Sequence, residues 1–182
     1  MKLHLVDLNA QLVTEWQRAF APFPEVEIVC ADLIAVAHSC VVSPANSYGF
    51  MDGGIDREYF ELFGQRVQNR VQDLIAQQPE GKLPVGASLV IRTYHEQVPF
   101  LILAPTMEFP GPCSHVNAYH AMVAVLRAAN SISGLVQDVF CPGLCTGTGR
   151  VAESDAADEM AAAYGDWRRK GDRGTGDRVT GD

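Results

Sequence analysis

Apolar residues follow two spacings along the 182-residue chain, and each spacing predicts a different kind of element. Short apolar runs bounded by polar or turn-forming residues predict strands. These runs lie at 2–6, 26–31, 40–43, 87–93, 100–104 and 139–142. Longer stretches with an apolar residue at every third or fourth position predict helices. They lie at 10–20, 33–37, 54–78, 114–129 and 153–168.

Residues that begin or end helices stand at the boundaries of these stretches. Asn9 is a favoured N-cap for the first helix, and Pro22 and Pro24 end it. Asp32 is a similar cap for the short helical turn that follows it. Gly64 lies inside the longest helical stretch, where we expect the helix to break.

Helices and strands alternate from one end of the chain to the other. This alternation predicts an α/β protein whose central sheet is covered on both faces. Apolar residues make up 47% of the chain, enough for one domain, which we place at 1–168. Residues 169–182 combine glycine and charge without apolar anchors, so we expect a tail that is disordered or not native.

Charge and hydropathy exclude some classes of function. The formal net charge of −8 argues against broad, sequence-independent binding of nucleic acid. A small polyanion remains compatible, because backbone N–H groups bind phosphate without net positive charge. The apolar runs are too short to cross a bilayer, so no membrane partner is expected. The beginning of the chain predicts a strand and not a signal peptide, which leads us to expect a cytoplasmic protein.

The five cysteines are odd in number and scattered, which argues against a secreted disulfide framework. Cys141 and Cys145 have C-x3-C spacing, but no second pair with metal-ligand spacing accompanies them. We therefore expect no metal and no cofactor. Cys145 lies beside a glycine loop without a histidine near it in sequence, so we expect a small loop residue and not a nucleophile.

Two glycine-rich segments each follow a predicted strand and precede a predicted helix. The first is SPANSYGFMDGGID, which begins at Ser43, and the second is CPGLCTGTGRV, which begins at Cys141. Glycines let the backbone approach a phosphate, and the following helix offers free N–H groups. Neither segment matches a Walker or dinucleotide motif, and each alone also fits a tight turn. Because both segments should meet at the carboxyl edge of one sheet, they predict a diphosphate site.

With these segments in view, the chain resembles the macrodomain family, whose members bind ADP-ribose, over roughly residues 26–164. The resemblance rests on ADLIAVAHSCVVSPAN, GGID, PTM followed by AYHAMVAVLRAA, and PGLCTGTGRV, in that order. It implies a three-layer α/β/α sandwich around a mixed, largely parallel sheet. It also implies a partner, either ADP-ribose or an ADP-ribosylated macromolecule.

The resemblance assigns expected roles to single residues. Asp32, with Leu33 beside it, matches the acid that accepts a hydrogen bond from the adenine amino group. Asn46 matches an amide at the distal ribose, and Asp56 matches the acid beside that ribose in hydrolytic relatives. The two diphosphate loops correspond to Gly53, Gly54 and Ile55, and to Thr146, Gly147, Thr148 and Gly149, with Arg150 next to the second. Tyr48 or Phe50 is a candidate aromatic wall.

Each of these residues also has a purely structural explanation. Asp32 fits a helix cap, and Asn46 fits an Asx-turn. Asp56 and Glu58 lie in the first turn of a helix, where acids complement the helix dipole. Arg150 fits an ion pair with Glu153 as well as a phosphate contact.

The chain departs from the hydrolytic pattern near Asp56. Ser43 and Pro44 replace the family's first Asn and the following Ala, the first glycine run has two residues, and Arg57 and Glu58 follow the acid. We therefore expect binding of ADP-ribose with weak or no hydrolysis. An ADP-ribosyl hydrolase that uses Asn46 and Asp56 is the alternative, and an unrelated nucleotide-binding domain is a weaker one.

Overall fold

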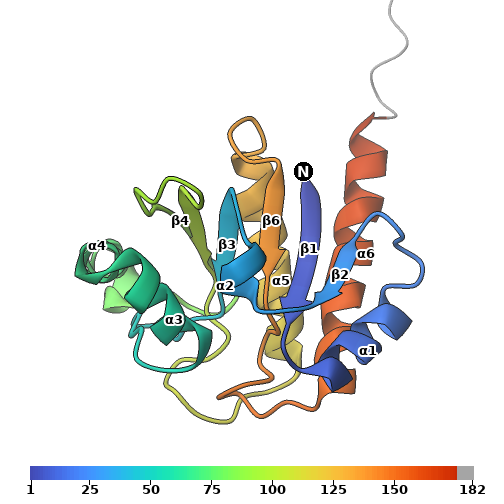
Figure 1. Cartoon of the computed structure of the whole chain (residues 1–182), viewed down its shortest axis with the longest axis horizontal. Helices are drawn as coiled ribbons and strands as arrows, with labels where there is room; N and C mark the ends of the chain where they lie inside the picture. The colour runs from blue at the N-terminus through green and yellow to red at the C-terminus, as the bar shows by residue number, and fades with distance from the viewer. Residues whose placement is uncertain (176–182) are drawn as a thin grey trace, which may run out of the picture.

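The computed structural model describes residues 1–175, and within them the strands form one sheet of six in the order β2-β1-β6-β3-β5-β4 (Figure 1). The strands are β1 (Lys2–Asp7), β2 (Glu27–Cys30), β3 (Cys40–Ser43), β4 (Leu89–Arg92), β5 (Phe100–Leu103) and β6 (Asp138–Cys141). β4 pairs with β5 in antiparallel orientation, and the other four pairs are parallel. The predicted mixed, largely parallel sheet is confirmed.

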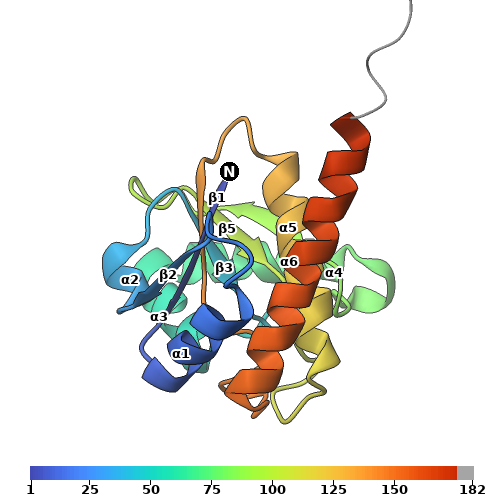
Figure 2. The same cartoon turned by 90° about the vertical axis from the view of Figure 1, so that its right-hand side faces the viewer.

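Helices cover both faces of this sheet, as the two views show (Figures 1 and 2). The helices are α1 (Ala10–Ala19), α2 (Leu33–Val36), α3 (Gly54–Phe63), α4 (Gln65–Ala76), α5 (Val116–Ser131) and α6 (Glu153–Thr175), with a short 3-10 turn at Pro79–Gly81. One apolar core joins the sheet to α1, α5 and α6, and a second joins it to α2, α3 and α4. This arrangement confirms the three-layer α/β/α sandwich.

The two cores explain the alternation of side chains along the central strands. In β3, Cys40 and Val42 face the core with α5, whereas Val41 faces the core with α4. In β5, Ile102 faces the core with α5 and Leu101 faces the core with α4. Because successive side chains in a strand point to opposite faces, a strand buried on both sides is apolar at every position. That is why these runs are short and continuously apolar.

The helix boundaries expected from the sequence are largely present. The Asn9 side chain accepts hydrogen bonds from the Gln11 and Leu12 N–H groups at 3.0 and 3.2 Å. Gly64 separates α3 from α4 with φ 76° and ψ 179°, so the predicted break is confirmed.

The last helix continues to Thr175, beyond the end that we predicted at 168. Arg168, Arg169 and Lys170 lie near its carboxyl end, where positive side chains interact favourably with the helix dipole. The remainder of the predicted tail, 176–182, lies outside the described residues. In the part of the chain that the structure describes, no helix is long and apolar enough to span a membrane.

The backbone at Gly64 generates a prediction about stability. Its φ and ψ lie in a region that is accessible almost only to glycine, and a built Cβ there meets no atom within 4 Å. We expect Gly64→Ala to lower the free energy of unfolding by about 1–3 kcal/mol through backbone strain alone. Denaturant unfolding measures this change. Gly134→Ala is the matched control, because Gly134 has equal space and no positive φ. Equal stability of the two variants would contradict the assigned backbone strain.

Candidate functional site

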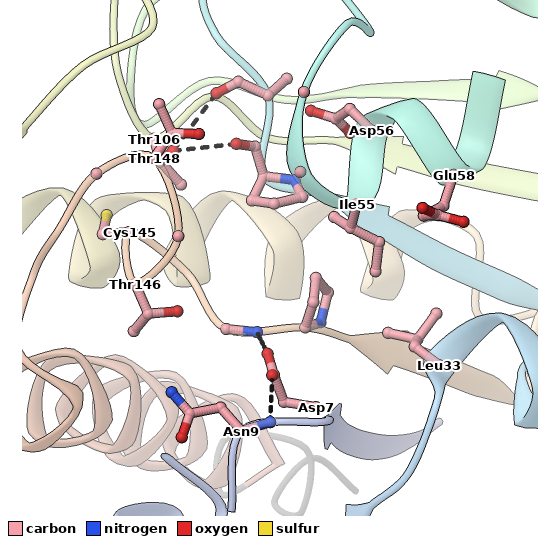
Figure 3. Close-up of a pocket in the computed structure, with 18 of the residues that line it drawn as sticks. Asp7, Asn9, Leu33, Ile55, Asp56, Glu58, Thr106, Cys145, Thr146 and Thr148 are labelled. Atoms are coloured by element: carbon pink, nitrogen blue, oxygen red, sulfur yellow. Dashed lines mark hydrogen bonds between the residues drawn. The ribbon is translucent and has the colours of Figure 1, made fainter. Parts of the chain in front are cut away.

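A cleft of about 640 Å³ opens at the carboxyl edge of the sheet (Figure 3). Its walls come from the segments that follow all five parallel strands: 7–9 after β1, 31–34 after β2, 44–58 after β3, 106–110 after β5 and 142–149 after β6. Parallel strands bring their carboxyl ends to one edge, which is where α/β proteins bind ligands. The cleft is therefore the candidate functional site.

Most of the predicted site residues line this cleft together. Those that do are Asp32, Leu33, Asn46, Gly53, Gly54, Ile55, Asp56, Thr146, Gly147, Thr148 and Gly149. The two glycine segments, which are about 90 residues apart in sequence, thus reach one cavity because β3 and β6 are neighbours in the sheet. Tyr48 and Phe50 are not part of the lining, although Asn46 and Asp52 are.

The first glycine segment leads directly into α3. Gly53 is the N-cap residue, and it has no side chain to cap the helix. The N–H groups of Gly54, Ile55 and Asp56 donate no hydrogen bond to other residues in the described part of the chain. A Cβ built on Gly53 or Gly54 meets no atom within 4 Å. The first loop therefore presents open backbone and unpartnered donors at a helix N-terminus.

In the second segment, Gly147 and Gly149 serve different purposes. A Cβ on Gly149 would lie 2.4 Å from the Cys145 carbonyl oxygen and 2.7 Å from Cys113 Sγ, so packing requires glycine there. A Cβ on Gly147 meets no atom within 4 Å, so packing does not explain that glycine. Among the described residues, the N–H groups of 146–149 have no hydrogen-bond acceptor. The second loop thus offers unpartnered donors as well.

Asp7 is a residue of the cleft that the sequence reasoning missed. Its Oδ1 accepts from the Asn9 N–H at 2.9 Å, and its Oδ2 accepts from the Gly143 N–H at 3.1 Å (Figure 3). This carboxylate joins the end of β1 to the start of the second glycine segment. Its position directly after the predicted strand 2–6, like that of Asp32 after the predicted strand 26–31, was the available signal.

Thr106 was also missed as a separate site residue, although it belongs to the PTM segment. Its Oγ1 donates to the Pro44 carbonyl oxygen at 3.0 Å, and its own carbonyl oxygen accepts from Asn117 Nδ2 at 2.8 Å. Figure 3 shows Thr106 and Asp56 on one side of the cleft and Asp7 and Asn9 on the other. Thr106 therefore links the segments after β3 and β5 beneath the cleft.

Asn46 lines the cleft, but its amide group is engaged within its own loop. Oδ1 accepts from the N–H groups of Tyr48 and Phe50 at 3.1 and 3.3 Å, and Nδ2 donates to the Phe50 carbonyl oxygen at 3.0 Å. The Asx-turn expected as the structural explanation is thus present. A contact between Asn46 and a ribose stays a prediction.

Asp32 has a structural role and a place in the cleft at the same time. Its Oδ1 accepts from the Ile34 N–H at 2.9 Å, so it caps α2. The residue is exposed and lines the cleft next to Leu33, which is buried. The two explanations for Asp32 are therefore compatible with each other.

Asp56 is a buried acid in the first turn of α3, only 7% exposed. Ser43 Oγ donates to its Oδ1 at 2.6 Å. Burial raises the pKa of Asp56 from 3.8 to about 7; the Ser43 hydrogen bond opposes this shift and the nearby Asp52 charge adds to it. Ser43, which replaces the Asn of the family pattern, thus acts directly on the candidate acid.

Two arginines that lie close to the glycine segments in sequence are outside the lining of the cleft. Arg57, which follows Asp56 in sequence, is exposed outside the lining and pairs with Glu61, one turn along α3, at 3.3 Å. For Arg150 the sequence left a phosphate contact and an ion pair with Glu153 open, and the residue also lies outside the lining. Its φ is 53° and its N–H donates to the Gly147 carbonyl oxygen, which closes a turn. Glu153, its expected partner, accepts from Asn9 Nδ2 at 3.0 Å.

The cleft is acidic. The carboxylates that line it are Asp7, Asp32, Asp52, Asp56 and Glu58. Of the residues that the structure describes, no Lys, Arg or His contributes to the lining. Cys145, the thiol in the lining, is 3% exposed, and its burial raises its pKa, which makes it a poor nucleophile at neutral pH. Within 1–175, no group of three or more His, Cys, Asp or Glu side chains could hold a metal ion.

Comparisons with known proteins connect this geometry to a family. The model of the family described as Macro domain matches residues 42–160. An uncharacterized protein of Aeropyrum pernix is 32% identical over 143 residues, which cover 76% of this chain and 71% of the relative. An uncharacterized protein of Aquifex aeolicus is 29% identical over 137 residues, which cover 75% of this chain and 78% of the relative.

Solved structures share the fold at low sequence identity. The macrodomain of Mycobacterium tuberculosis DarG has a TM-score of 0.65 and 17% identity, covering 75% of this chain and 88% of that one. The Oceanobacillus iheyensis macrodomain with ADP has a TM-score of 0.60 and 16% identity, with coverage of 70% and 67%. Thermosipho africanus DarTG in complex with ADP-ribose has a TM-score of 0.60 and 14% identity, with coverage of 74% and 37%.

The raised pKa of Asp56 predicts a pH dependence of stability. Between pH 4 and 7 the native state keeps a proton on Asp56 that the unfolded chain releases. The contribution of this proton to the free energy of unfolding is therefore complete below pH 3.8, the pKa of the carboxyl group in the unfolded chain. It is lost as the pH rises to about 7, the pKa in the native state. Relative to Asp56→Asn, the parent should lose about 1.4 kcal/mol of unfolding free energy per pH unit in this window. Above pH 7 the difference should level off.

Denaturant unfolding of both proteins at a series of pH values measures this difference. Asp52→Asn is a control for the general effect of removing a nearby charge, because Asp52 is exposed. A difference between the parent and Asp56→Asn that does not change between pH 4 and 7 would contradict the assigned pKa.

Proposed function

Since the chain belongs to the macro domain family, we propose that it binds ADP-ribose or an ADP-ribosyl derivative in the cleft at the carboxyl edge of the sheet. The family is known for ADP-ribose binding, and similar folds are solved with ADP and with ADP-ribose. Membership of this family also removes the reason to consider an unrelated nucleotide-binding domain.

The observation that carries this proposal is the set of unpartnered backbone donors on two facing loops. Gly54, Ile55 and Asp56 offer N–H groups at a helix N-terminus, and 146–149 offer a second series. Buried or ligand-facing N–H groups need hydrogen-bond acceptors, and a diphosphate has several oxygens that accept hydrogen bonds. The helix dipole of α3 favours negative charge at the same place. Backbone donors thus take the role that basic side chains have in other phosphate sites.

The shape of the cleft supports one orientation of the ligand. The adenine would lie toward α2, where Val6, Leu33 and Ile34 offer apolar surface and Asp32 offers a carboxylate. The diphosphate would lie between the two glycine loops. The distal ribose would then lie beside Asn46 and the buried Asp56, next to the segments that follow β3 and β5.

One observation favours a second function, the release of ADP-ribose from a modified acceptor. A carboxyl group with a pKa of about 7 inside a ligand cleft is suited to general acid–base catalysis near neutral pH. Asp56 would take a proton from the water as its oxygen bonds to the anomeric carbon of the ribose, and would pass that proton to the acceptor as the bond between acceptor and ribose breaks. Arg57 does not obstruct this place, because it pairs with Glu61 outside the cleft. Glu58 does line the cleft and adds negative charge there.

Gly147→Glu tests the binding function. The new side chain has space, so the fold should survive, but its charge would face the diphosphate. We expect the affinity for ADP-ribose to fall by about 100-fold or more, since like charges in contact cost several kcal/mol. Titration calorimetry measures the affinity, and thermal melting checks the fold. Gly134→Glu, in the loop between α5 and β6 and equally unobstructed, is the matched control. Unchanged affinity in folded Gly147→Glu would mean that the second loop is only a turn and does not bind the diphosphate.

Asp56→Asn tests the hydrolytic function. If Asp56 is a general base, the variant should lower the release of ADP-ribose from a modified protein by about 100-fold or more. Its affinity for free ADP-ribose should stay within a few-fold or increase, because a carboxylate is removed near an anion. Quantifying released ADP-ribose over time gives the turnover. Absence of turnover in the parent protein would leave binding as the function, as expected from the sequence.

A further inference from the structure

Three aromatic rings form a stacked row beside the cleft, which we call the aromatic ladder: Phe50, Tyr48 and Phe109. The Tyr48 and Phe109 centroids are 4.9 Å apart with planes 30° apart, and the Tyr48 and Phe50 centroids are 6.3 Å apart with planes 28° apart. Phe50 is 44% exposed and Phe109 is 61% exposed. Burial in the core therefore does not explain why these large apolar rings are present.

The ladder joins the two loops that form the distal-ribose end of the cleft. The Ser47 N–H donates to the Met107 carbonyl oxygen at 2.9 Å, and Asn46 forms an isolated bridge with Met107. Asn46 and Met107 line the cleft. So do Asp52 and Pro110, which follow Phe50 and Phe109 in the sequence. A group attached to the distal ribose would leave the cleft along this border.

The charges around the ladder indicate which kind of planar group it would bind, because carboxylates attract a cation and repel an anion. Asp52 follows Phe50 by two positions and has no ion-pair partner among the described residues, and Glu108 precedes Phe109. Glu108 pairs with Lys82 at 3.0 Å, so Asp52 is the uncompensated charge. With an acidic cleft and a net charge of −8, a phosphate-bearing or acidic acceptor would be repelled. A flat cation is favoured by both the rings and the carboxylates.

We propose that the aromatic ladder receives the guanidinium of an ADP-ribosylated arginine in a basic peptide or protein. Arginine is the planar cation among the side chains, and it stacks on aromatic faces. This inference rests on the proposed function, because it assumes that ADP-ribose occupies the cleft with its distal ribose toward Asn46. Phe109 and Phe50 provide the stacking faces, and Asp52 provides the charge.

The test compares three ligands by calorimetry: free ADP-ribose, a peptide with ADP-ribosyl-arginine, and the same peptide with ADP-ribosyl-serine in place of the arginine conjugate. We expect the arginine conjugate to bind about 2- to 30-fold more tightly than the serine conjugate, the range of a cation–π contact. The advantage should shrink as salt rises, because an exposed carboxylate contributes to it. An ADP-ribosylated oligonucleotide should bind more weakly than free ADP-ribose.

Phe109→Leu should remove most of this advantage and leave the affinity for free ADP-ribose unchanged, since Phe109 is outside the cleft lining. Phe50→Leu should act in the same direction. Asp52→Asn should lower the ratio of arginine-conjugate to free ADP-ribose affinity, because it removes a charge that attracts the cation and repels the diphosphate. Tyr94→Leu is the control. The Tyr94 ring is similarly exposed and stacks with Arg66 of α4. Tyr94 lies in the turn between β4 and β5, at the edge of the sheet opposite the cleft.

The outcomes separate this inference from the proposed function. If the parent does not bind free ADP-ribose, the proposed function fails. If it binds ADP-ribose but treats the arginine and serine conjugates alike, the inference fails and the proposed function stands. Tighter binding of the oligonucleotide conjugate would assign the ladder to nucleobases and overturn the inference. If Phe109→Leu lowers the melting temperature but keeps the preference for the arginine conjugate, the ladder only stabilises the contact between the two loops and the inference fails.

Discussion

The parallel pairing of β1, β2, β3, β5 and β6 is the constraint on which the rest of the molecule depends. Because the five strands point the same way, the five segments after them meet at one edge of the sheet. The pairing of β3 with β6 brings together two glycine loops that are distant in sequence. Asp7 then joins the loop after β6 to the end of β1 through the Gly143 N–H. The cleft is thus a direct consequence of strand order.

The electrostatic character of the cleft is unusual for the diphosphate site that we propose there. Five carboxylates and unpartnered backbone N–H groups line it, and the basic residues nearest in sequence, Arg57 and Arg150, lie outside the lining. Backbone donors are fixed in position by the fold, so they need no ordering of long side chains when a diphosphate binds. They also contribute no net charge, which leaves the surrounding carboxylates to act on whatever is attached to the ligand. In the proposed function, discrimination at the acceptor end and binding of the diphosphate would therefore depend on different groups.

Prediction from sequence succeeded where the signal was local. The Asn9 and Asp32 caps, the break at Gly64 and the buried run 40–43 follow from rules that involve neighbouring residues. It did not decide whether Arg57 and Arg150 line the cleft, because the direction of a side chain depends on backbone torsions and distant partners. Asp7 went unnoticed because its acceptor role involves an N–H group 136 residues away. Asn46 was seen as both a turn residue and a ribose contact, and only its hydrogen bonds in the folded loop establish the first.

The sequence by itself determined the class of fold, the order of its elements and the presence of two glycine loops after strands. These properties are encoded in periodicity, caps and glycine positions, which act over a few residues. Only the tertiary structure decided which glycine is packed and which is open, since Gly149 and Gly147 look alike in sequence but only Gly149 has Cys113 and Cys145 against it. Only the tertiary structure raised the pKa of Asp56 to about 7, because the burial that causes this shift, and the Ser43 hydrogen bond that opposes it, arise when α3 packs on the sheet. Properties of this kind depend on atoms brought together by folding, and no local pattern contains them.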